Sequence, residues 1–114
     1  MSDKKFAIPK ESIQNLVPNS GGCLATDRIM VDGHEIGYMY REDSSRLYDS
    51  GWCFFAGDED DNYANDPNRL GIYLVNTVAN YDPDILPYIE TPAPCAFEKI
   101  AGTKTYKRVV FQSG

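Results

Sequence analysis

The sequence predicts an α+β fold in which a mainly antiparallel, twisted sheet carries a few short helices. Short stretches rich in aromatic and β-branched residues recur along the 114 residues and are separated by Gly, Pro and Asn turns, which is typical of strands. The segments between them carry helix caps or a helical spacing of apolar residues, but each is short. The hydrophobic fraction of 42% allows one core, so we expect a single domain over residues 1–114.

The N-terminal part is predicted to contain a short helix over residues 9–17. Pro9 suits a first helical position, because the N–H that proline lacks is not needed there. Three apolar residues then share one helical face, namely Ile13, Leu16 and Val17.

Four strands are predicted in the next part of the chain. Residues 23–26 form a short strand, and residues 28–31 and 35–41 form a hairpin about the Asp32-Gly33 pair, which is a strong type I′ turn signal. Residues 51–56 are apolar on both faces, which predicts a strand in the middle of the sheet.

The second half is predicted to alternate short helices with strands. Asp58 is expected to cap a short helix over residues 59–65, and residues 70–76 are expected to form a strand. Asp82 is expected to cap a turn or short helix that starts at the following proline. A C-terminal hairpin is predicted over residues 96–112, about a Gly-Thr pair.

The negative charge is concentrated in one window. Residues 42–66 contain eight acids and one base, which gives −7, and the rest of the chain contains nine acids and ten bases, which gives +1. Their sum is the formal charge of −6. A local acidic patch predicts a cationic protein partner, while the net negative charge argues against nucleic acid as a partner.

The sequence carries no pattern that would indicate a cofactor, catalysis or secretion. The three cysteines are far apart and match no CxxC spacing, so we expect reduced thiols in the cytoplasm. No apolar run is long enough for a signal peptide or a membrane span, so no membrane association is expected. The one histidine, His34, has no companion ligand or catalytic residue at a known spacing. We therefore expect neither an enzyme nor a bound metal or cofactor.

The candidate binding surface combines four consecutive acids with nearby aromatic residues. Asp58, Glu59, Asp60 and Asp61 follow directly on the aromatic strand over residues 51–56. Acids in the first turn of a helix also stabilise that helix, because they interact favourably with the positive end of its dipole. This explains Asp58 and Asp61 without a binding partner. The aromatic residues expected to act as anchors are Trp52, Tyr63 and Tyr81. Other aromatic residues would line either a recognition surface or the core, among them Tyr38, Tyr40 and Tyr73.

A second interpretation is a small-ligand-binding module or an uncharacterised enzyme. Residues 76–82 are rich in hydrogen-bonding groups, with Asn76, Asn80, Tyr81 and an acid. Helix capping and turn chemistry account for the same residue types without a ligand. A deep pocket lined by these side chains would favour the ligand interpretation, whereas a shallow acidic face with exposed aromatic rings would favour protein binding.

Several long sequence words occur in order along the chain: GCLATDRI over residues 22–29, VDG over 31–33, GYMYRE over 37–42, DSGW over 49–52 with FF and GDED after it, and NTVANYDP over 76–83. Through them the chain resembles, over roughly residues 22–100, the bacterial immunity protein 33-like family, formerly a domain of unknown function. The resemblance implies a protein that binds a cognate bacterial toxin in the producing cell and blocks it. It carries over no catalytic residue set. The acidic, aromatic-flanked patch would suit a basic toxin domain, particularly a nuclease.

Overall fold

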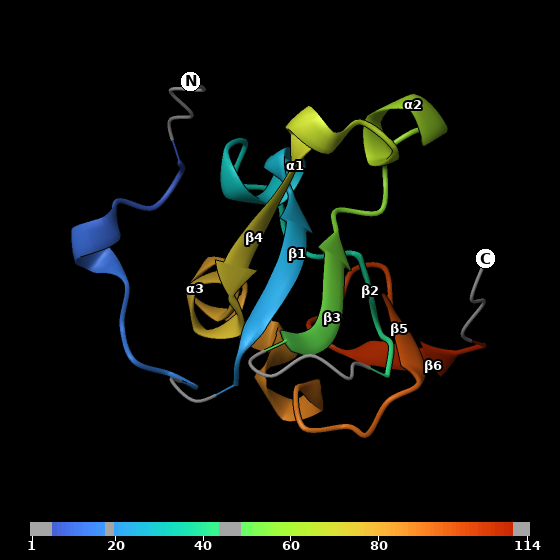
Figure 1. The fold of residues 1–114 in the computed structure, drawn as a ribbon. Helices are drawn as coiled ribbons and strands as arrows, with labels where there is room; N and C mark the ends of the chain where they lie inside the picture. The colour runs from blue at the N-terminus through green and yellow to red at the C-terminus, as the bar shows by residue number, and fades with distance from the viewer. Residues whose placement is uncertain (1–5, 18–19, 44–48, 111–114) are drawn as a thin grey trace.

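The computed structural model describes residues 6–17, 20–43 and 49–110, and its strands form one sheet (Figure 1). The strands lie in the order β4-β1-β3-β2-β5-β6. Their bounds are Gly22–Thr26 (β1), Tyr38–Arg41 (β2), Asp49–Phe55 (β3), Leu70–Leu74 (β4), Cys95–Lys99 (β5) and Tyr106–Val109 (β6). Neighbouring strands are antiparallel except β1 and β3, which are parallel. The predicted α+β class with a mainly antiparallel sheet is confirmed.

The helices of the described chain are all short. The α-helices are Asp27–Met30 (α1), Asp61–Ala64 (α2) and Val75–Tyr81 (α3), and the 3-10 helices are Lys10–Ser12 (η1), Pro67–Arg69 (η2) and Pro83–Tyr88 (η3). In the part of the chain that the structure describes, no helix combines the length and the apolar character needed to cross a membrane.

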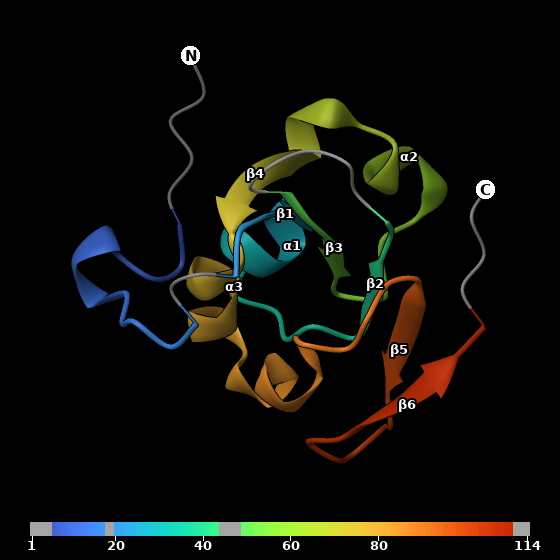
Figure 2. The same ribbon diagram turned by 60° about the horizontal axis from the view of Figure 1, so that its bottom comes forward.

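The sheet curves around two of the α-helices and buries one of its faces. Figure 2 shows the strands in an arc around α1 and α3. Side chains at alternate strand positions point to this side, and Ala25 of β1 and Phe54 of β3 are fully buried there. The helical side contributes further members of the same core cluster, including Ile29, Val75, Val78 and Ile85. The other face of the sheet is therefore left to the outside.

The predicted hairpin about Asp32-Gly33 is wrong, because its first arm falls in α1 and its second arm pairs with β3 and β5. Gly33 has a φ of 76°, and its N–H donates to the carbonyl of Ile29 at 3.1 Å. The Asp-Gly pair thus ends a helix. A type I′ turn and a helix end both need a residue with positive φ, so the Asp-Gly signal alone does not separate them.

The helix predicted over residues 9–17 is wrong beyond its first turn, since only Lys10–Ser12 is helical. The backbone N–H groups of Gln14, Leu16 and Val17 donate to side chains of α3 instead of to carbonyls of their own segment. A short isolated helix is only marginally stable, so these tertiary contacts decide the conformation.

The strand predicted over residues 51–56 and the predicted C-terminal hairpin are both confirmed. The strand over residues 51–56 is found as β3, which lies inside the sheet between β1 and β2. The C-terminal hairpin is found as the antiparallel pair β5 and β6. Residues 111–112 of the predicted hairpin lie outside the described residues.

The helices of the second half differ from the prediction in two places. The strand predicted over residues 70–76 ends at Leu74, where α3 takes over. Helix α2 is shorter than predicted, and its cap is Asp60 rather than Asp58. Asp82 does cap η3, as expected, by accepting a hydrogen bond from the backbone N–H two residues later.

Candidate functional site

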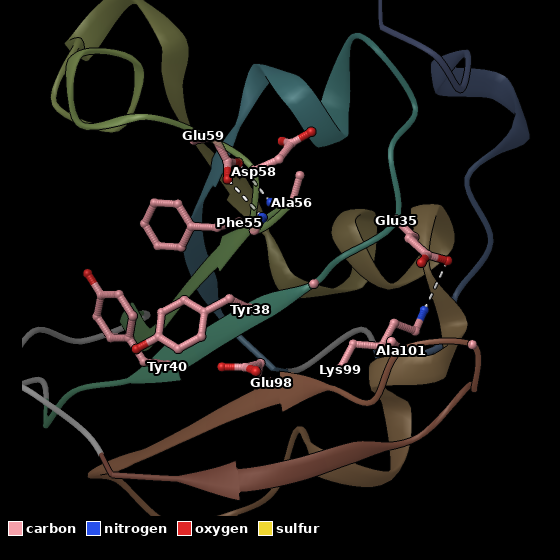
Figure 3. Close-up of a pocket in the computed structure, with 13 residues that line it drawn as sticks. Glu35, Tyr38, Tyr40, Phe55, Ala56, Asp58, Glu59, Glu98, Lys99 and Ala101 are labelled. Atoms are coloured by element: carbon pink, nitrogen blue, oxygen red, sulfur yellow. Dashed lines mark hydrogen bonds and ion pairs between the residues drawn. The ribbon is translucent and has the colours of Figure 1, made fainter.

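A groove of about 600 Å³ opens on the outward face of the sheet (Figure 3). It is lined by residues of β2, the end of β3, the end of β5 and the loops that follow β3 and β5. The groove combines aromatic rings, carboxylates and one lysine, and none of its aromatic residues belongs to the core cluster on the other face.

Three aromatic side chains form the floor of this groove. Tyr38 and Tyr40 lie on β2, and Phe55 lies opposite Tyr38 on β3. The ring centroid of Phe55 lies 5.9 Å from that of Tyr40 and 6.2 Å from that of Tyr38. Met39 points the other way and is fully buried, because successive side chains of a strand alternate between its faces. All three rings are partly exposed, so their surface is accessible from outside the fold.

Four carboxylates surround the floor. Glu98 lies on β5 with 54% of its side chain exposed, and Glu35, Asp58 and Glu59 supply the others. Lys99 is the one base among the lining residues, and three carboxylates already surround its ammonium group. Four acids against one base give the lining a formal charge of −3. Such a concentration of one sign of charge attracts cations.

Glu59 shapes the groove by fixing the loop that follows β3. Its carboxylate accepts hydrogen bonds from the backbone N–H groups of Ala56 at 2.7 Å and Gly57 at 2.8 Å. It also accepts a hydrogen bond from the Thr26 hydroxyl at 2.6 Å, which ties the loop to the end of β1. Gly57 has a φ of 100°, a conformation that favours glycine. Glu59 is thus a positioning residue as well as a source of charge.

Asp58 forms an ion pair with Arg28 at the rim of the groove. The guanidinium donates to the carboxylate from Nη2 at 2.7 Å and from Nε at 3.1 Å. These hydrogen bonds lower the pKa of Asp58, so the carboxylate is ionised at neutral pH. Water reaches both side chains and screens the pair, so its contribution to stability is small. A cationic partner can therefore compete with Arg28 for this carboxylate.

The remaining residues of the predicted acidic surface lie outside the groove lining. Asp60 caps α2 by accepting a hydrogen bond from the Tyr63 N–H at 2.8 Å, and Asp61 is exposed in the first turn of that helix. The guanidinium carbon of Arg69 lies 5.2 Å from the Tyr63 ring centroid and covers one side of the ring. The acidic run is therefore divided between the groove rim and α2.

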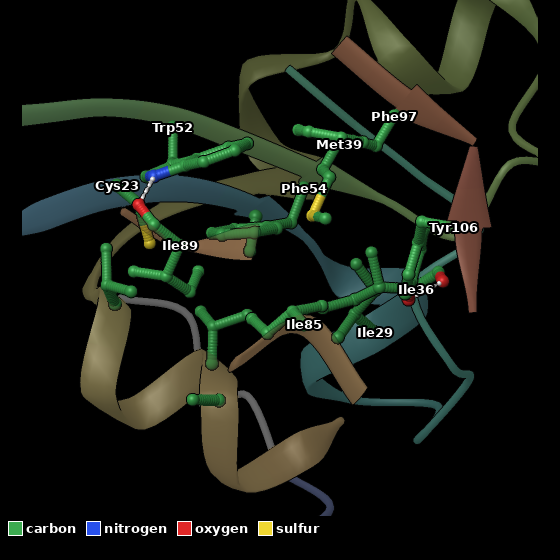
Figure 4. Packing of buried hydrophobic residues seen from close by; sticks show 14 of the residues in the cluster. Cys23, Ile29, Ile36, Met39, Trp52, Phe54, Ile85, Ile89, Phe97 and Tyr106 are labelled. Carbon is green, nitrogen blue, oxygen red and sulfur yellow. Dashed lines mark hydrogen bonds between the residues drawn. The ribbon is translucent and has the colours of Figure 1, made fainter. Parts of the chain in front are cut away.

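Trp52 is not an exposed anchor, which corrects the expectation from the sequence. Only 1% of the residue is exposed, and its ring stacks on Phe54 with centroids 5.7 Å apart (Figure 4). Its Nε1–H donates to the carbonyl of Ile89 at 3.0 Å. Because β3 is an interior strand, the side chains of alternate residues enter the core, and Trp52 is one of them.

Asn76 holds an N-terminal strap, which we define as residues 6–17. Its side-chain carbonyl accepts hydrogen bonds from the N–H groups of Leu16 at 2.6 Å and Val17 at 2.8 Å. Its side-chain amide donates to the carbonyl of Gln14 at 2.9 Å. Asn76 is 6% exposed, so these bonds satisfy a buried polar group.

Asn80 and Tyr81 hold the same strap at two further points. Asn80 bonds both the N–H and the carbonyl of Gln14, each at 2.9 Å. The Tyr81 hydroxyl accepts from the N–H of Ile8 at 3.1 Å and donates to its carbonyl at 3.3 Å. Tyr81 does not line the acidic groove, and Asp82 caps η3. The hydrogen-bonding groups that suggested a ligand site are thus largely used to bind the chain's own backbone.

Asn76→Ala is expected to release the strap. The change leaves the N–H groups of Leu16 and Val17 without their acceptor, which should lower the free energy of unfolding by about 1–3 kcal/mol. Limited proteolysis would show faster cleavage within residues 6–17, and urea denaturation would measure the loss of stability. Thr77→Ala on the same helix is the control, and equal cleavage of the two variants would contradict the clamp.

The thiol next to the groove floor is poorly suited to nucleophilic chemistry. Cys53 faces Tyr40 across the β2–β3 pair and is 8% exposed. Burial raises the pKa of the Cys53 thiol, so the thiol is protonated at neutral pH. Among the residues that the structure describes, no group of three or more His, Cys, Asp or Glu side chains is placed to hold a metal ion. What the groove supplies is charge and aromatic surface.

Sequence reasoning finds the acidic rim of the groove more readily than its floor. Glu98 is not singled out by any motif, Phe55 is not distinguished from its core neighbour Phe54, and Tyr38 and Tyr40 are indistinguishable from core tyrosines in the sequence. Their common face becomes visible only through the pairing of β2 with β3 and with β5, which places these four residues side by side. The signal that was available is the alternation of side chains within each strand.

Comparison with known protein families gives a match. The family model described as Immunity protein Imm33 domain matches residues 23–110. No curated protein and no solved structure matches the chain. The matched region begins in β1 and ends after β6, so it includes the groove. It also includes the whole C-terminal hairpin, whereas the resemblance seen in the sequence extends only to about residue 100. Since this region is more than half of the chain, the protein belongs to the Immunity protein Imm33 domain family.

Proposed function

We propose that the protein binds and neutralises a cognate bacterial toxin, and that the acidic groove is part of its contact surface. Family membership supports the immunity role. The observation that supports the surface is the aromatic floor ringed by four carboxylates on the outward face of the sheet. Aromatic residues are enriched at protein interfaces and dominate their binding energy. The mechanism is stoichiometric occlusion of the toxin and involves no reaction.

The chemistry of the groove favours a basic partner. Glu98 is half exposed, and its nearest cation is Lys107 at 3.9 Å, which is a weak pairing across two strands. An arginine or lysine side chain of the partner would lay its stem on the rings of Tyr40 and Phe55 and bring its charge to this carboxylate. A basic toxin domain, such as a nuclease domain, presents such side chains.

Beyond the groove, the outward face of the sheet carries an exposed apolar patch, formed by Leu24 of β1 and Ile72 of β4. Leu24 is in register with Cys53 on one side and with Ile72 on the other. Leu24 is 38% exposed and Ile72 is 82% exposed, while α1 and α3 pack on the opposite face. Exposed apolar side chains in one patch are typical of protein interaction sites. This continuity supports a protein partner that covers more of the face than the groove alone.

We also propose that the protein acts in the cytoplasm of the producing cell as a single domain. The three cysteines are unpaired and buried, which suits a reducing compartment. The strands and the α1 and α3 helices share one core cluster, which supports one folding unit.

Glu98→Lys is expected to weaken toxin binding, because it places a positive charge where a cation of the partner would lie. The tagged protein would be used to isolate its partner from native lysate, and the identified partner would then be purified for kinetics. At low ionic strength the association rate should fall by about tenfold or more, and the difference from wild type should shrink in high salt. In cells, co-expression of this variant should no longer relieve the growth arrest that the partner causes.

Glu90→Lys provides a matched control, since Glu90 is exposed and lies outside the groove lining. It carries the same charge change and should bind and protect as wild type does. Tyr38→Ala should raise the dissociation rate, because it removes contact area without changing the charge, and should leave the salt dependence of association as in wild type. If Glu98→Lys and Glu90→Lys bind a confirmed toxin equally well, the groove is not the contact surface.

A further inference from the structure

A second cavity, of about 510 Å³, lies between the N-terminal strap and the body of the fold. Phe6, Ile8 and Ile13 of the strap form one wall. The other wall includes Met30 of α1 and Tyr73 of β4. This cavity shares no lining residue with the acidic groove.

The strap beside this cavity is held largely by hydrogen bonds to its backbone. The three clamps described above, from Asn76, Asn80 and Tyr81, grip the backbone of the strap. Val17 at the end of the strap packs against the core cluster, but Phe6 at its start is 45% exposed and meets Tyr73 edge-on at a centroid distance of 5.8 Å. Apolar side chains around an unfilled space have lost the contacts that dense packing would provide.

The lining of the cavity is uncharged but not wholly apolar. None of its ten residues is Asp, Glu, Lys, Arg or His. Asn15 of the strap and Thr77 of α3 face the cavity, and their side chains make no hydrogen bond to any residue that the structure describes. A ligand that filled the apolar part would therefore find a donor and an acceptor at the polar end.

The geometry points to a binding site for an uncharged, largely apolar small molecule that carries a hydrogen-bonding group. The volume lies within the range of small-molecule sites, roughly 300–1,000 Å³. An uncharged lining would leave an ionic ligand without a counter-charge, and such burial is unfavourable. The strap forms one wall of the site, and a pocket of this volume suits a small molecule. This site is independent of the proposed toxin contact.

Nile red, an uncharged apolar dye with a carbonyl acceptor, is a suitable probe. Titration into the full chain should give a blue-shifted emission that saturates at one equivalent. Ile13→Trp adds bulk inside the cavity and should weaken binding at least tenfold. Thr77→Val keeps the shape but removes the hydroxyl, and it should weaken binding by about fivefold.

Two controls keep the result specific. Leu16→Trp adds the same ring to the strap at a residue outside the lining, and Glu98→Lys alters only the acidic groove. Both should bind the dye as wild type does. Emission that does not saturate, or equal binding by Ile13→Trp and Leu16→Trp, would overturn the site. Neither result would bear on the toxin contact, which is tested by the charge variants of the groove.

Discussion

Trp52→Ala is expected to lower the free energy of unfolding by about 3–5 kcal/mol, as is usual when a large buried aromatic side chain is removed. The indole stacks on Phe54 and contacts Phe97, at centroid distances of 5.7 Å and 6.5 Å. Its removal also takes away the shorter of two hydrogen bonds to the Ile89 carbonyl, at 3.0 Å, and leaves the one from Arg41 Nη1 at 3.4 Å. Domains are typically stable by about 5–15 kcal/mol, so the loss is a large fraction of the total. Urea denaturation followed by far-ultraviolet circular dichroism would measure it, since the variant has no other tryptophan.

Two controls separate a core role from a contact role for this residue. Trp52→Phe keeps an aromatic ring but not the hydrogen bond, so it should cost clearly less than alanine. Tyr63→Ala, at a partly exposed position on α2, should change stability by less than about 1 kcal/mol. A Trp52→Ala variant as stable as wild type, but impaired in toxin binding, would restore the residue to the contact surface.

Lys99→Met is expected to cost about 3–5 kcal/mol, because it removes the cation that pairs with the buried carboxylate of Asp82 and with two more exposed carboxylates. The Lys99 Nζ lies 3.1 Å from Glu35, 3.4 Å from Asp84 and 3.5 Å from Asp82. The side chains of Lys99 and Asp82 are 7% and 5% exposed, so water cannot replace the lost partner. The Tyr106 hydroxyl also bonds Asp82, at 3.3 Å, which links the C-terminal hairpin to the same group. Urea denaturation at neutral pH would measure the effect.

The same cluster predicts a pH dependence. Burial by itself lowers the pKa of Lys99, but the hydrogen bond that Lys99 donates to Glu35 and the charges of Asp82 and Asp84 outweigh it, so the pKa is raised. A raised folded-state pKa stabilises the fold fully below the pKa of an unfolded lysine, which is about 10.4. That stabilisation is lost as the pH rises through the folded value. Wild type should therefore lose stability in alkaline solution by a step that Lys99→Met lacks.

Lys107→Met is the matched control for this prediction. Lys107 lies on the neighbouring strand, is 59% exposed and has one carboxylate at 3.9 Å, so its removal should change stability by less than about 0.5 kcal/mol. Asp82→Asn, added to Lys99→Met, should recover part of the loss because the unpaired charge is gone. Equal stability of the two lysine variants would mean that the Lys99 cluster contributes nothing to folding.

The parts of the fold that could be predicted are those with a strong local pattern. The apolar stretch of β3 predicts an interior strand, and the Asp-Pro pair at residues 82–83 predicts the capped start of a helix. The α3 helix also has a sequence pattern that predicts it, because Val75, Val78 and Ala79 have helical spacing. All three are fully buried in the structure. The preceding strand pattern concealed it, because β-branched residues suit both a strand and a buried helix face.

The errors share one physical origin, which is that distant groups decide local structure. The strap fails to form a helix because amides about 60 residues away take its backbone N–H groups. The same amides look like a ligand site in the sequence, where their partners cannot be seen. The groove floor is hidden for the same reason. Register between strands brings Tyr38, Phe55 and Glu98 together, and nothing in a single strand reports that register.

The placement of β2 between β3 and β5 has a consequence for when the protein can work. The floor of the groove needs β2 and β3, but Glu98 arrives on β5, about 40 residues later along the chain. During synthesis on the ribosome, a chain shorter than about 100 residues therefore carries aromatic side chains without the full acidic rim. Pairings between such distant segments also form slowly compared with local ones. For the proposed role, a cell under attack would depend on copies that had already finished folding, rather than on those it had just begun to make.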